Sequence, residues 1–281
     1  MFSYRHGFHA GNHADVLKHV MLVQMLSYLT AKETPLWVVD THAGAGVYSL
    51  DSVFAQKKGE FKTGIGRLWG KSDVPPALAE YLKQVRKLNK GEALQHYPGS
   101  PQIALQMLRD QDRLQLFEMH TTESEVLQKQ YANVKRKVSV QPTDGFAGLK
   151  SALPPASRRG LVLIDPSYED KADYGRVVEA MRDALHRFAT GVYAVWYPQV
   201  QRPESKDLSG QLQELAPKGW LHATLKVMAP ARDGLGLHGS GVFVFNPPWK
   251  LEEALSPVMP VLVKLLGQDR SASYSLRSRK D

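Results

Sequence analysis

The sequence predicts an α/β protein built on one mostly parallel, doubly wound sheet. Short apolar runs of strand length recur along the chain, helical periodicity separates most of them, and turn-forming or acidic residues follow several of the runs. Strands that alternate with helices are typical of parallel sheets with helices on both faces. With 281 residues and 43% apolar content, the chain is long enough to bury such a core in one domain spanning residues 1–281.

Seven strands are predicted, six of them parallel. They cover residues 36–40, 114–118, 138–140, 161–165, 192–197, 221–228 and 241–245, and a helix is predicted over residues 14–29. The connection between the last two strands, residues 231–240, is rich in glycine and too short for a crossover helix. These two strands should therefore form an antiparallel hairpin, with the reversed strand at the edge of the sheet.

Two segments depart from the alternation of strand and helix. More than sixty residues separate Gly46 from the strand at residue 114, whereas a simple strand–helix–strand unit needs about thirty, so residues 52–95 are predicted to be an inserted helical subdomain. One helical face there carries Lys83, Arg86, Lys87 and Lys90, which form either a solvated face or a contact for phosphates. The polar tail, residues 268–281, is predicted to be disordered.

Charge and composition narrow the class of partner. The formal net charge of +8 favours a polyanion, nucleic acid before a membrane surface. The absence of cysteine excludes disulfides, thiolate catalysis and cysteine-bound metal. No run approaches the roughly 20 apolar residues of a membrane span, and the first residues lack the apolar stretch of a secretion signal. We expect a cytoplasmic protein without a membrane partner or an obligate protein partner, and a monomer.

Polar residues follow the first three predicted parallel strands. Asp40 leads into a loop with His42, Gly44 and Gly46, Glu118 ends the second strand, and Asp144-Gly145 follows the third. Ligands of open parallel sheets bind at the carboxyl ends of the strands, where glycines admit a ligand to the backbone and a carboxylate accepts from ribose hydroxyls. An aspartate can likewise accept from an adenine amine. The set in this order predicts an S-adenosylmethionine site, and the topology is that of class I (Rossmann-like) methyltransferases.

A candidate catalytic motif, Asp165-Pro166-Ser167-Tyr168, follows the apolar run 161–164. It resembles the D/N-P-P-Y/F/W signature of methyltransferases that modify the exocyclic amine of adenine, with Ser167 in place of the second proline. The lone pair of that amine is delocalised, and acceptors for its hydrogens would direct it at the methyl group. The Asp165 carboxylate and the Pro166 carbonyl are the expected acceptors, and Tyr168 is expected to stack on the base. The alternative is an ordinary turn.

Asn246-Pro247-Pro248-Trp249 matches the same signature more literally. It follows the predicted reversed strand, however, whose carboxyl end points to the edge of the sheet opposite the cofactor. We therefore do not expect Asn246 to accept the target amine.

Residues 5–19 contain four histidines, a density that suggests either a metal or the polar lining of a cleft. Without a clear carboxylate–histidine pattern we predict no metal. Tyr4, His6 and Lys18 are candidates for substrate binding, and His19 is a candidate for the cofactor. Ser100, in the turn Tyr97-Pro98-Gly99-Ser100-Pro101, is expected to cap a helix or to contact a ligand.

The combined motifs resemble the RlmJ family of bacterial large-subunit (23S) ribosomal RNA adenine-N6 methyltransferases. The matching segments are residues 4–6, 11–19, 40–46, 97–101, 144–145, 158–161 and 246–250. The resemblance implies methylation of an adenine N6 amine in ribosomal RNA, Asp165 as the catalytic residue, Tyr4 at the substrate and a helical insert. It also implies cofactor contacts at His19, His42, Ser100, Glu118, Asp144 and Gly145.

Two other functions are compatible with these residues. A DNA adenine-N6 methyltransferase would flip its base from a duplex and would usually carry a recognition domain, and none is evident here. A nucleic-acid-binding protein for the use or catabolism of external DNA, a description also given to members of this family, would keep the fold without turnover.

Overall fold

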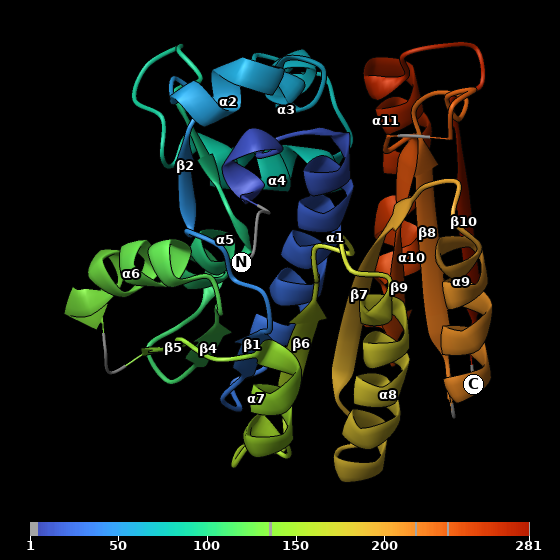
Figure 1. Ribbon diagram of the computed structural model, residues 1–281. Coiled ribbons are helices and arrows are strands. Elements are labelled where there is room, and N and C mark those ends of the chain that lie inside the picture. Colours follow the sequence, from blue (N-terminus) through green and yellow to red (C-terminus); the bar gives the residue numbers. More distant parts are fainter. Residues whose placement is uncertain (1–4, 135–136, 217, 235, 281) are drawn as a thin grey trace.

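The computed structural model of this chain describes residues 5–134, 137–216, 218–234 and 236–280. In this part, eight strands form one sheet in the order β10-β8-β9-β7-β6-β1-β4-β5, and β2 and β3 form a separate ribbon (Figure 1). The strands are β1 (Trp37–Asp40), β2 (Val47–Ser49), β3 (His96–Pro98), β4 (Arg113–Phe117), β5 (Val138–Gln141), β6 (Gly160–Ile164), β7 (Val192–Gln199), β8 (Trp220–Lys226), β9 (Gly239–Phe245) and β10 (Ser273–Arg279).

Helices connect most of the strands. The α-helices are α1 (His13–Thr30), α2 (Val53–Lys58), α3 (Ile65–Leu68), α4 (Pro76–Arg86), α5 (Ser100–Met107), α6 (Thr121–Gln130), α7 (Gly145–Ala152), α8 (Ala172–Arg187), α9 (Pro203–Leu215), α10 (Leu251–Leu255) and α11 (Val258–Leu266). Three short 3-10 turns complete the set: η1 (His6–Phe8), η2 (Glu60–Lys62) and η3 (Ala132–Val134).

The sheet is mostly parallel, as predicted, but it has eight strands rather than seven. Strands β5, β4, β1, β6 and β7 pair in parallel, and β8 takes the same direction because it pairs antiparallel with β9, itself antiparallel to β7. The hairpin of β8 and β9 is as predicted. The edge position of the reversed strand was wrong: β9 lies between β7 and β8, where it satisfies the backbone of both neighbours.

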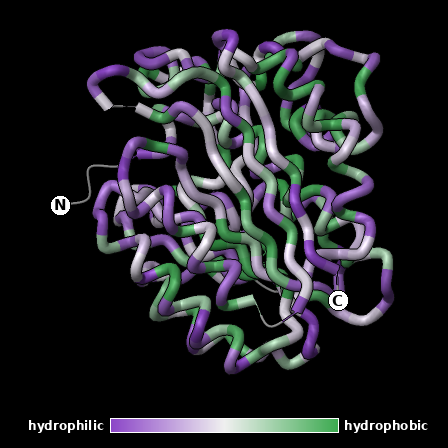
Figure 2. Tube along the Cα trace, turned by 90° about the vertical axis from the view of Figure 1, so that its right-hand side faces the viewer, coloured by the Kyte–Doolittle hydropathy of each residue, from purple (hydrophilic) through white to green (hydrophobic). Residues whose placement is uncertain are grey.

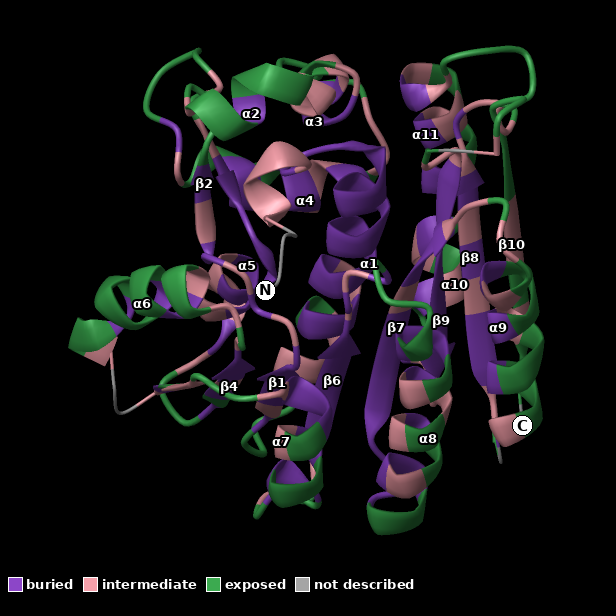
Figure 3. Cartoon of the chain, viewed as in Figure 1, coloured by how far each residue is buried: buried purple, intermediate pink, exposed green. Residues whose placement is uncertain are grey.

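Each face of the sheet is covered by its own layer of helices. Along β6, Leu161 and Leu163 belong to the core cluster that contains side chains of α1, α4, α5, α10 and α11, whereas Val162 and Ile164 belong to the cluster that contains side chains of α7, α8 and α9. Successive strand side chains point to opposite faces, so a buried parallel strand is apolar on both. Figure 2 shows the hydrophobic residues gathered along the central strands, and Figure 3 shows exposed residues on the outward sides of helices such as α6, α8 and α9 and in the connecting loops.

Strand β10 corrects the prediction of a disordered tail over residues 268–281. Residues 273–279 pair antiparallel with β8, and the Arg279 guanidinium donates to the carbonyl oxygens of Ala216 (3.0 Å) and Lys218 (2.9 Å). Leu276 is the side chain that packs against the core. An edge strand obtains its backbone bonds from one neighbour and exposes one side to water, so the polar composition that suggested disorder is compatible with a strand.

The ribbon of β2 and β3 brings the two ends of residues 52–95 together. Tyr48 pairs with Tyr97, and the Gly99 N–H donates to the Gly46 carbonyl oxygen at 2.8 Å. Between these strands the chain forms α2, η2, α3 and α4, which Figure 1 shows above the sheet on the side where the parallel strands end. Among the described residues, no helix has both the length and the apolar content needed to cross a bilayer.

Candidate active site

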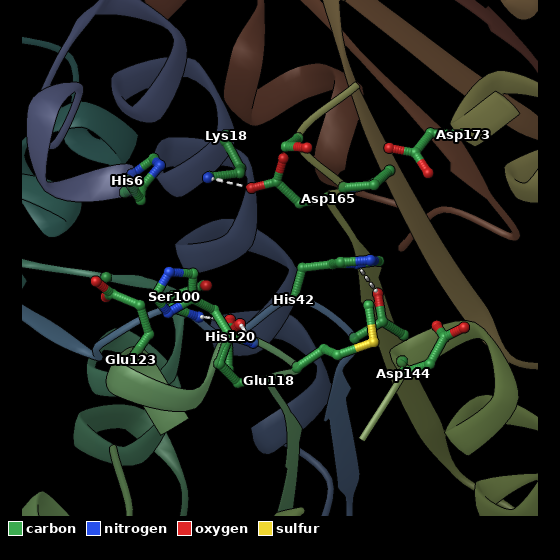
Figure 4. Close-up of a pocket in the computed structure, with 18 of the residues that line it drawn as sticks. His6, Lys18, His42, Ser100, Glu118, His120, Glu123, Asp144, Asp165 and Asp173 are labelled. Carbon is green, nitrogen blue, oxygen red and sulfur yellow. Dashed lines mark hydrogen bonds and ion pairs between the residues drawn. The ribbon is translucent and has the colours of Figure 1, made fainter. Parts of the chain in front are cut away.

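A pocket opens at the carboxyl ends of β1, β4 and β6, between the start of α1 and the first turn of α7 (Figure 4). Eleven of the site residues predicted from the sequence line it. They are His6, Lys18, His19, His42, Gly44, Ser100, Glu118, Asp144, Gly145, Asp165 and Pro166. Strands and helices that are far apart in the sequence thus supply one site.

Asp40 anchors the glycine loop beneath the pocket. Its carboxylate accepts from the Ser100 hydroxyl at 2.6 Å and from the His42 N–H at 3.2 Å. Burial raises its pKa to about 6, although both hydrogen bonds oppose that shift. Gly44 has a φ of +60°, and a Cβ at this position would collide with the Tyr48 hydroxyl. The loop therefore requires glycine where it passes the ligand space.

Glu118 follows β4 and is held by two backbone amides. One carboxylate oxygen accepts from Gly44 N and the other from His120 N, each at 2.7 Å. Burial raises the pKa of Glu118, and the two amides offset part of that shift. Each oxygen retains a lone pair, so the carboxylate can accept a pair of hydroxyls from the pocket side.

Asp144 caps α7 at the third strand end. Its Oδ1 accepts from Phe146 N at 2.9 Å, and its Oδ2 accepts from the Arg176 guanidinium at 2.5 Å. A Cβ on Gly145 would collide with the Thr41 carbonyl oxygen, so α7 approaches the β1 loop closely only because this residue is glycine. The His42 ring packs edge-on against Phe146 with the ring centroids 5.0 Å apart, and burial lowers its pKa to about 4.

Several residues that line the pocket have a buried polar side-chain atom without a partner within the described chain. These atoms are His19 Nε2, His120 Nδ1 and Glu123 Oε2. His19 Nδ1 bonds the Tyr97 hydroxyl at 2.8 Å, and burial lowers the pKa of His19 to about 3, so the ring is neutral. Unpaired buried polar atoms are costly, so this lining fits a ligand rich in hydrogen-bonding groups, as S-adenosylmethionine is.

Asp165, directly after β6, is paired with a buried lysine. Lys18 Nζ forms an ion pair with Asp165 Oδ2 and a second one with Asp15 Oδ1 at 3.0 Å. Burial alone would lower the pKa of Lys18, but the two carboxylates outweigh it and raise that pKa. Burial raises the pKa of Asp165, and Lys18 opposes the rise. Asp165 Oδ1 has no hydrogen bond within the described residues and remains available to a ligand.

Three sequence predictions for substrate contacts have different outcomes. His6 lines the pocket and bonds Asp15 through its Nε2 at 2.9 Å, whereas Tyr4 lies outside the described residues. Tyr168 is 3% exposed and is not part of the pocket lining. Its hydroxyl donates to the Trp196 carbonyl oxygen at 2.8 Å and its ring packs on Tyr174. The expected stacking face of Tyr168 is therefore turned into the core.

Sequence reasoning missed several residues that line the pocket and also Asp15, which bonds the lining residues His6 and Lys18. Asp15 escaped notice, although a buried Asp–Lys pair three residues apart on an otherwise apolar helix was a visible signal. Arg176 has the same spacing from Asp173, at 3.3 Å. Met119 and His120 directly follow the predicted strand 114–118, a signal that was available, whereas Tyr48 and Glu123 reach the pocket only through tertiary packing.

Asn246 lies at the other end of the sheet, because Phe245 at the end of β9 pairs with Tyr193 at the start of β7. Its side-chain amide donates to the carbonyl oxygens of Ala189 (2.8 Å) and Gly191 (2.7 Å). This motif forms a structural turn. Among the described residues, no group of three or more His, Asp or Glu side chains is placed to hold a metal ion.

Comparisons with known proteins give the family. A family model described as "Ribosomal RNA large subunit methyltransferase D, RlmJ" matches residues 33–277. The ribosomal RNA large subunit methyltransferase J of Haemophilus influenzae is 45% identical over 277 residues, which is 98% of each chain. The Escherichia coli protein of the same name is 46% identical over 262 residues, or 93% of each chain.

A solved structure shares the fold along almost the whole chain. The crystal structure of a Legionella pneumophila protein superposes with a TM-score of 0.89 at 36% identity, covering 96% of this chain and 98% of that one. Because the family model and both relatives match along most of its length, the chain belongs to the RlmJ family of ribosomal RNA large-subunit methyltransferases.

Proposed function

We propose that this protein methylates the N6 amine of an adenine in large-subunit ribosomal RNA and that Asp165 receives that amine. Family membership makes the protein an S-adenosylmethionine-dependent methyltransferase that acts on ribosomal RNA. The proposal concerns the atom that is methylated and the residues responsible. It rests on one observation: a buried carboxylate followed by a proline lies at the end of β6, inside the pocket built by the other strand ends.

S-adenosylmethionine supplies an electrophilic methyl group, and the residues of the chain prepare the amine. Lys18 occupies Asp165 Oδ2, so Oδ1 can accept one N–H of the amine, and the Pro166 carbonyl oxygen can accept the other. Both bonds hold the nitrogen lone pair toward the methyl group. The new C–N bond replaces the methyl C–S bond of the donor, which leaves as S-adenosylhomocysteine, and Asp165 takes one proton from the cationic amine to give the neutral methylated amine.

The opposite side of the pocket suits the methyl donor. We assign Glu118 to the ribose hydroxyls and Asp144 with Gly145 to the adenine end. His19, His42, Gly44 and Ser100 complete the wall. The unpaired atoms His19 Nε2 and Glu123 Oε2 favour a polar ligand here over an apolar one.

The test is the nucleoside content of ribosomal RNA. Mass spectrometry of large-subunit RNA from a deletion strain should show the loss of one N6-methyladenosine. A plasmid copy of the natural gene should restore it, and a copy carrying Asp165→Ala should not. Unchanged N6-methyladenosine in the deletion strain, with another methylated nucleoside missing, would refute the choice of N6.

We further propose that the protein acts as a cytoplasmic monomer. One chain supplies the acceptor side and the donor side of the pocket, so the chemistry needs no second copy. Light scattering on the purified protein, with and without RNA, should give the mass of one chain, 31.4 kDa, for the free protein. A stable dimer would contradict this.

A further inference from the structure

The amino-terminal end of α2 carries an exposed apolar patch close to the active site. Val53 is 81% exposed and Phe54 is 40% exposed. Phe54 meets Phe8 edge-on, with 5.1 Å between the ring centroids. We call Arg5, Phe8, Val53, Phe54 and Lys57 the α2 platform. Figure 3 shows α2 exposed along its outer side, and solvent-exposed apolar side chains that cluster in this way commonly mark binding surfaces.

Cations border the rings of the platform. The Arg5 guanidinium lies 5.2 Å from the centroid of Phe54, and Lys57 Nζ lies 5.9 Å from the centroid of Phe8. Aromatic rings interleaved with cations are the common equipment of proteins that bind single-stranded nucleic acid. The rings and the guanidinium plane offer stacking surfaces for bases, and the charges offer contacts for phosphates.

The platform is continuous with the wall of the active-site pocket. His6 and Tyr48 both line the pocket, and their ring centroids are 5.2 Å apart. A Cβ on Gly7 would lie 3.6 Å from Phe54 Cβ and 3.9 Å from Tyr48 Cδ1, so this one residue separates the pocket wall from the platform. Figure 1 shows α2 beside η1, over the edge at which the parallel strands end.

We propose that the α2 platform stacks an unpaired ribosomal RNA base that neighbours the target adenosine. The inference rests on the proposed function: an adenine drawn into the pocket leaves its neighbours without a stacking partner. A ring system at the mouth of the pocket replaces that partner and holds the strand in register. The charges favour RNA over a protein partner, because Arg5 and Lys57 lie over the rings, and Glu60 nearby is already bonded to His9 at 2.9 Å and Asn12 at 3.0 Å.

Fluorescence of a labelled RNA tests the stack directly. Two probes are heptamers of uridine with one central adenosine and 2-aminopurine on its 5′ or its 3′ side. Stacking quenches 2-aminopurine, so the natural protein should quench one of the two probes on binding. Phe54→Ala should abolish the quenching and raise the Kd roughly tenfold, as expected for one lost stack between a base and an aromatic ring.

Two further variants make the result specific. Phe54→Leu keeps an apolar side chain but removes the flat ring, and it should lose the quenching as well. Tyr274→Ala removes an aromatic ring of similar exposure (45%) on β10, far from the pocket in the sheet order, and should bind both probes as the natural protein does. Natural quenching and affinity in Phe54→Ala would overturn the proposal. Natural affinity in Phe54→Leu would do the same and would indicate an apolar contact, such as a protein partner would make.

Methylation of ribosomal RNA from the deletion strain separates this inference from the proposed function. Phe54→Ala should raise KM for RNA roughly tenfold while kcat stays unchanged. An unchanged KM would count against the platform. Failure of the natural protein to form N6-methyladenosine would refute the proposed function, and the fluorescence titration would still decide whether the platform binds an unpaired base.

Discussion

The two proline motifs of this chain share a local signature and differ in almost everything else. Asp165-Pro166 opens into a pocket at the carboxyl ends of the parallel strands, where a buried lysine balances its carboxylate. Asn246-Pro247 follows the reversed strand β9 at the opposite end of the parallel strands. There the side-chain amide of Asn246 donates to the carbonyl oxygens of Ala189 and Gly191.

The contrast extends to the aromatic residue that closes each motif. Tyr168 is 3% exposed, and its hydroxyl donates to the Trp196 carbonyl oxygen in the core. Trp249 is 69% exposed, and Lys280 Nζ lies over its ring at 5.4 Å from the centroid. A four-residue signature therefore does not define a catalytic site by itself. The direction of the preceding strand and the partner of the acidic residue decide what the signature does.

Substituting the first residue of each proline motif should give the largest difference in methyl-transfer rate between the two motifs. Asp165→Asn keeps the shape but loses the charge that accepts the proton, so methyl transfer should fall by about a thousandfold or more. S-adenosylmethionine binding, measured by calorimetry, should change little, because Glu118 and Asp144 lie on the other side of the pocket.

Asn246→Ala is the matched variant at the opposite edge. It should keep the methyl-transfer rate and lose about 1 to 3 kcal/mol of unfolding free energy, because two backbone carbonyls lose their donor. An inactive Asn246→Ala together with an active Asp165→Asn would show that the second proline motif, and not the first, is the catalytic one.

Removing the lysine partner of Asp165 should lower the methyl-transfer rate, because it raises the pKa of Asp165. Lys18 holds that pKa down against burial, so in Lys18→Met it rises and a smaller fraction of Asp165 is ionised at any given pH. Methyl transfer should fall by roughly a hundredfold near neutral pH and recover partly as pH increases. The measurement is the single-turnover rate against pH. A rate that falls by the same factor at every pH would speak against an effect through Asp165 ionisation.

The carboxylates Asp40, beside the pocket, and Glu252, beside the second proline motif, should change the unfolding free energy with pH in opposite directions. Folded Asp40 keeps its proton up to a pKa of about 6, whereas the unfolded chain releases it near 3.8. The unfolding free energy should therefore fall between these values, by about 2 to 3 kcal/mol, and then level off. Denaturant unfolding of Asp40→Asn should lack this fall.

Glu252, beside the second motif, provides the comparison. Its bonds to Ser278 and Lys280 lower its pKa, so its contribution to stability is present above the pKa of the unfolded chain and is lost in acid. Glu252→Gln should be slightly less stable than the natural protein at neutral pH and equal to it in acid. For each variant, the measurement is its difference in unfolding free energy from the natural protein as a function of pH. If this difference changed with pH in the same direction for Asp40→Asn and Glu252→Gln, the predicted contrast between the buried and the solvated carboxylate would be refuted.

The smallest effect concerns the four cations of the insert. Replacing Lys83, Arg86, Lys87 and Lys90 by glutamine should weaken RNA binding several-fold, and each true phosphate contact should remove close to one unit of the salt slope. Part of this face is already engaged within the protein: Arg86 lies 5.8 Å over the Trp69 ring, and Lys87 donates to Gln84 at 2.8 Å. An unchanged salt slope would identify it as a solvated face. Lys250→Gln at the opposite edge should not alter RNA binding.

The sequence predicted the parts of the fold that depend on local periodicity. All seven expected strands are present, because continuous apolar runs such as residues 161–164 have little alternative to a buried strand. The order of β9 and β8 could not be predicted, since either order satisfies the same hairpin. Strand β10 was not predicted, because it is stabilised by pairing with β8 and not by its own composition.

The site was predictable where a residue lies at the end of a strand. Asp40, Glu118 and Asp165 are placed by the sheet itself, and all three strand ends meet at one edge. The ion pair between Lys18 and Asp165 joins positions that are 147 residues apart, so only packing of α1 against the sheet creates it. The orientation of Tyr168 depends on its positive φ of 55° and on Trp196, neither of which the sequence displays.

The ribbon of β2 and β3 gives this enzyme a place to change without disturbing its chemistry. The chain leaves the sheet region after Gly46 and returns at Gly99, and a hydrogen bond of 2.8 Å between these two glycines closes the excursion. Helix α4 is fixed by its burial against α1, with Leu78 and Tyr81 fully buried, but the entropy of closing a loop grows only slowly with its length, so the exposed connection over residues 70–73 can change in length at small cost while the ends stay fixed. Relatives could therefore diverge in how they grip RNA and keep the same methyl-transfer centre, and chimaeras exchanged at this junction offer a direct route to new RNA targets.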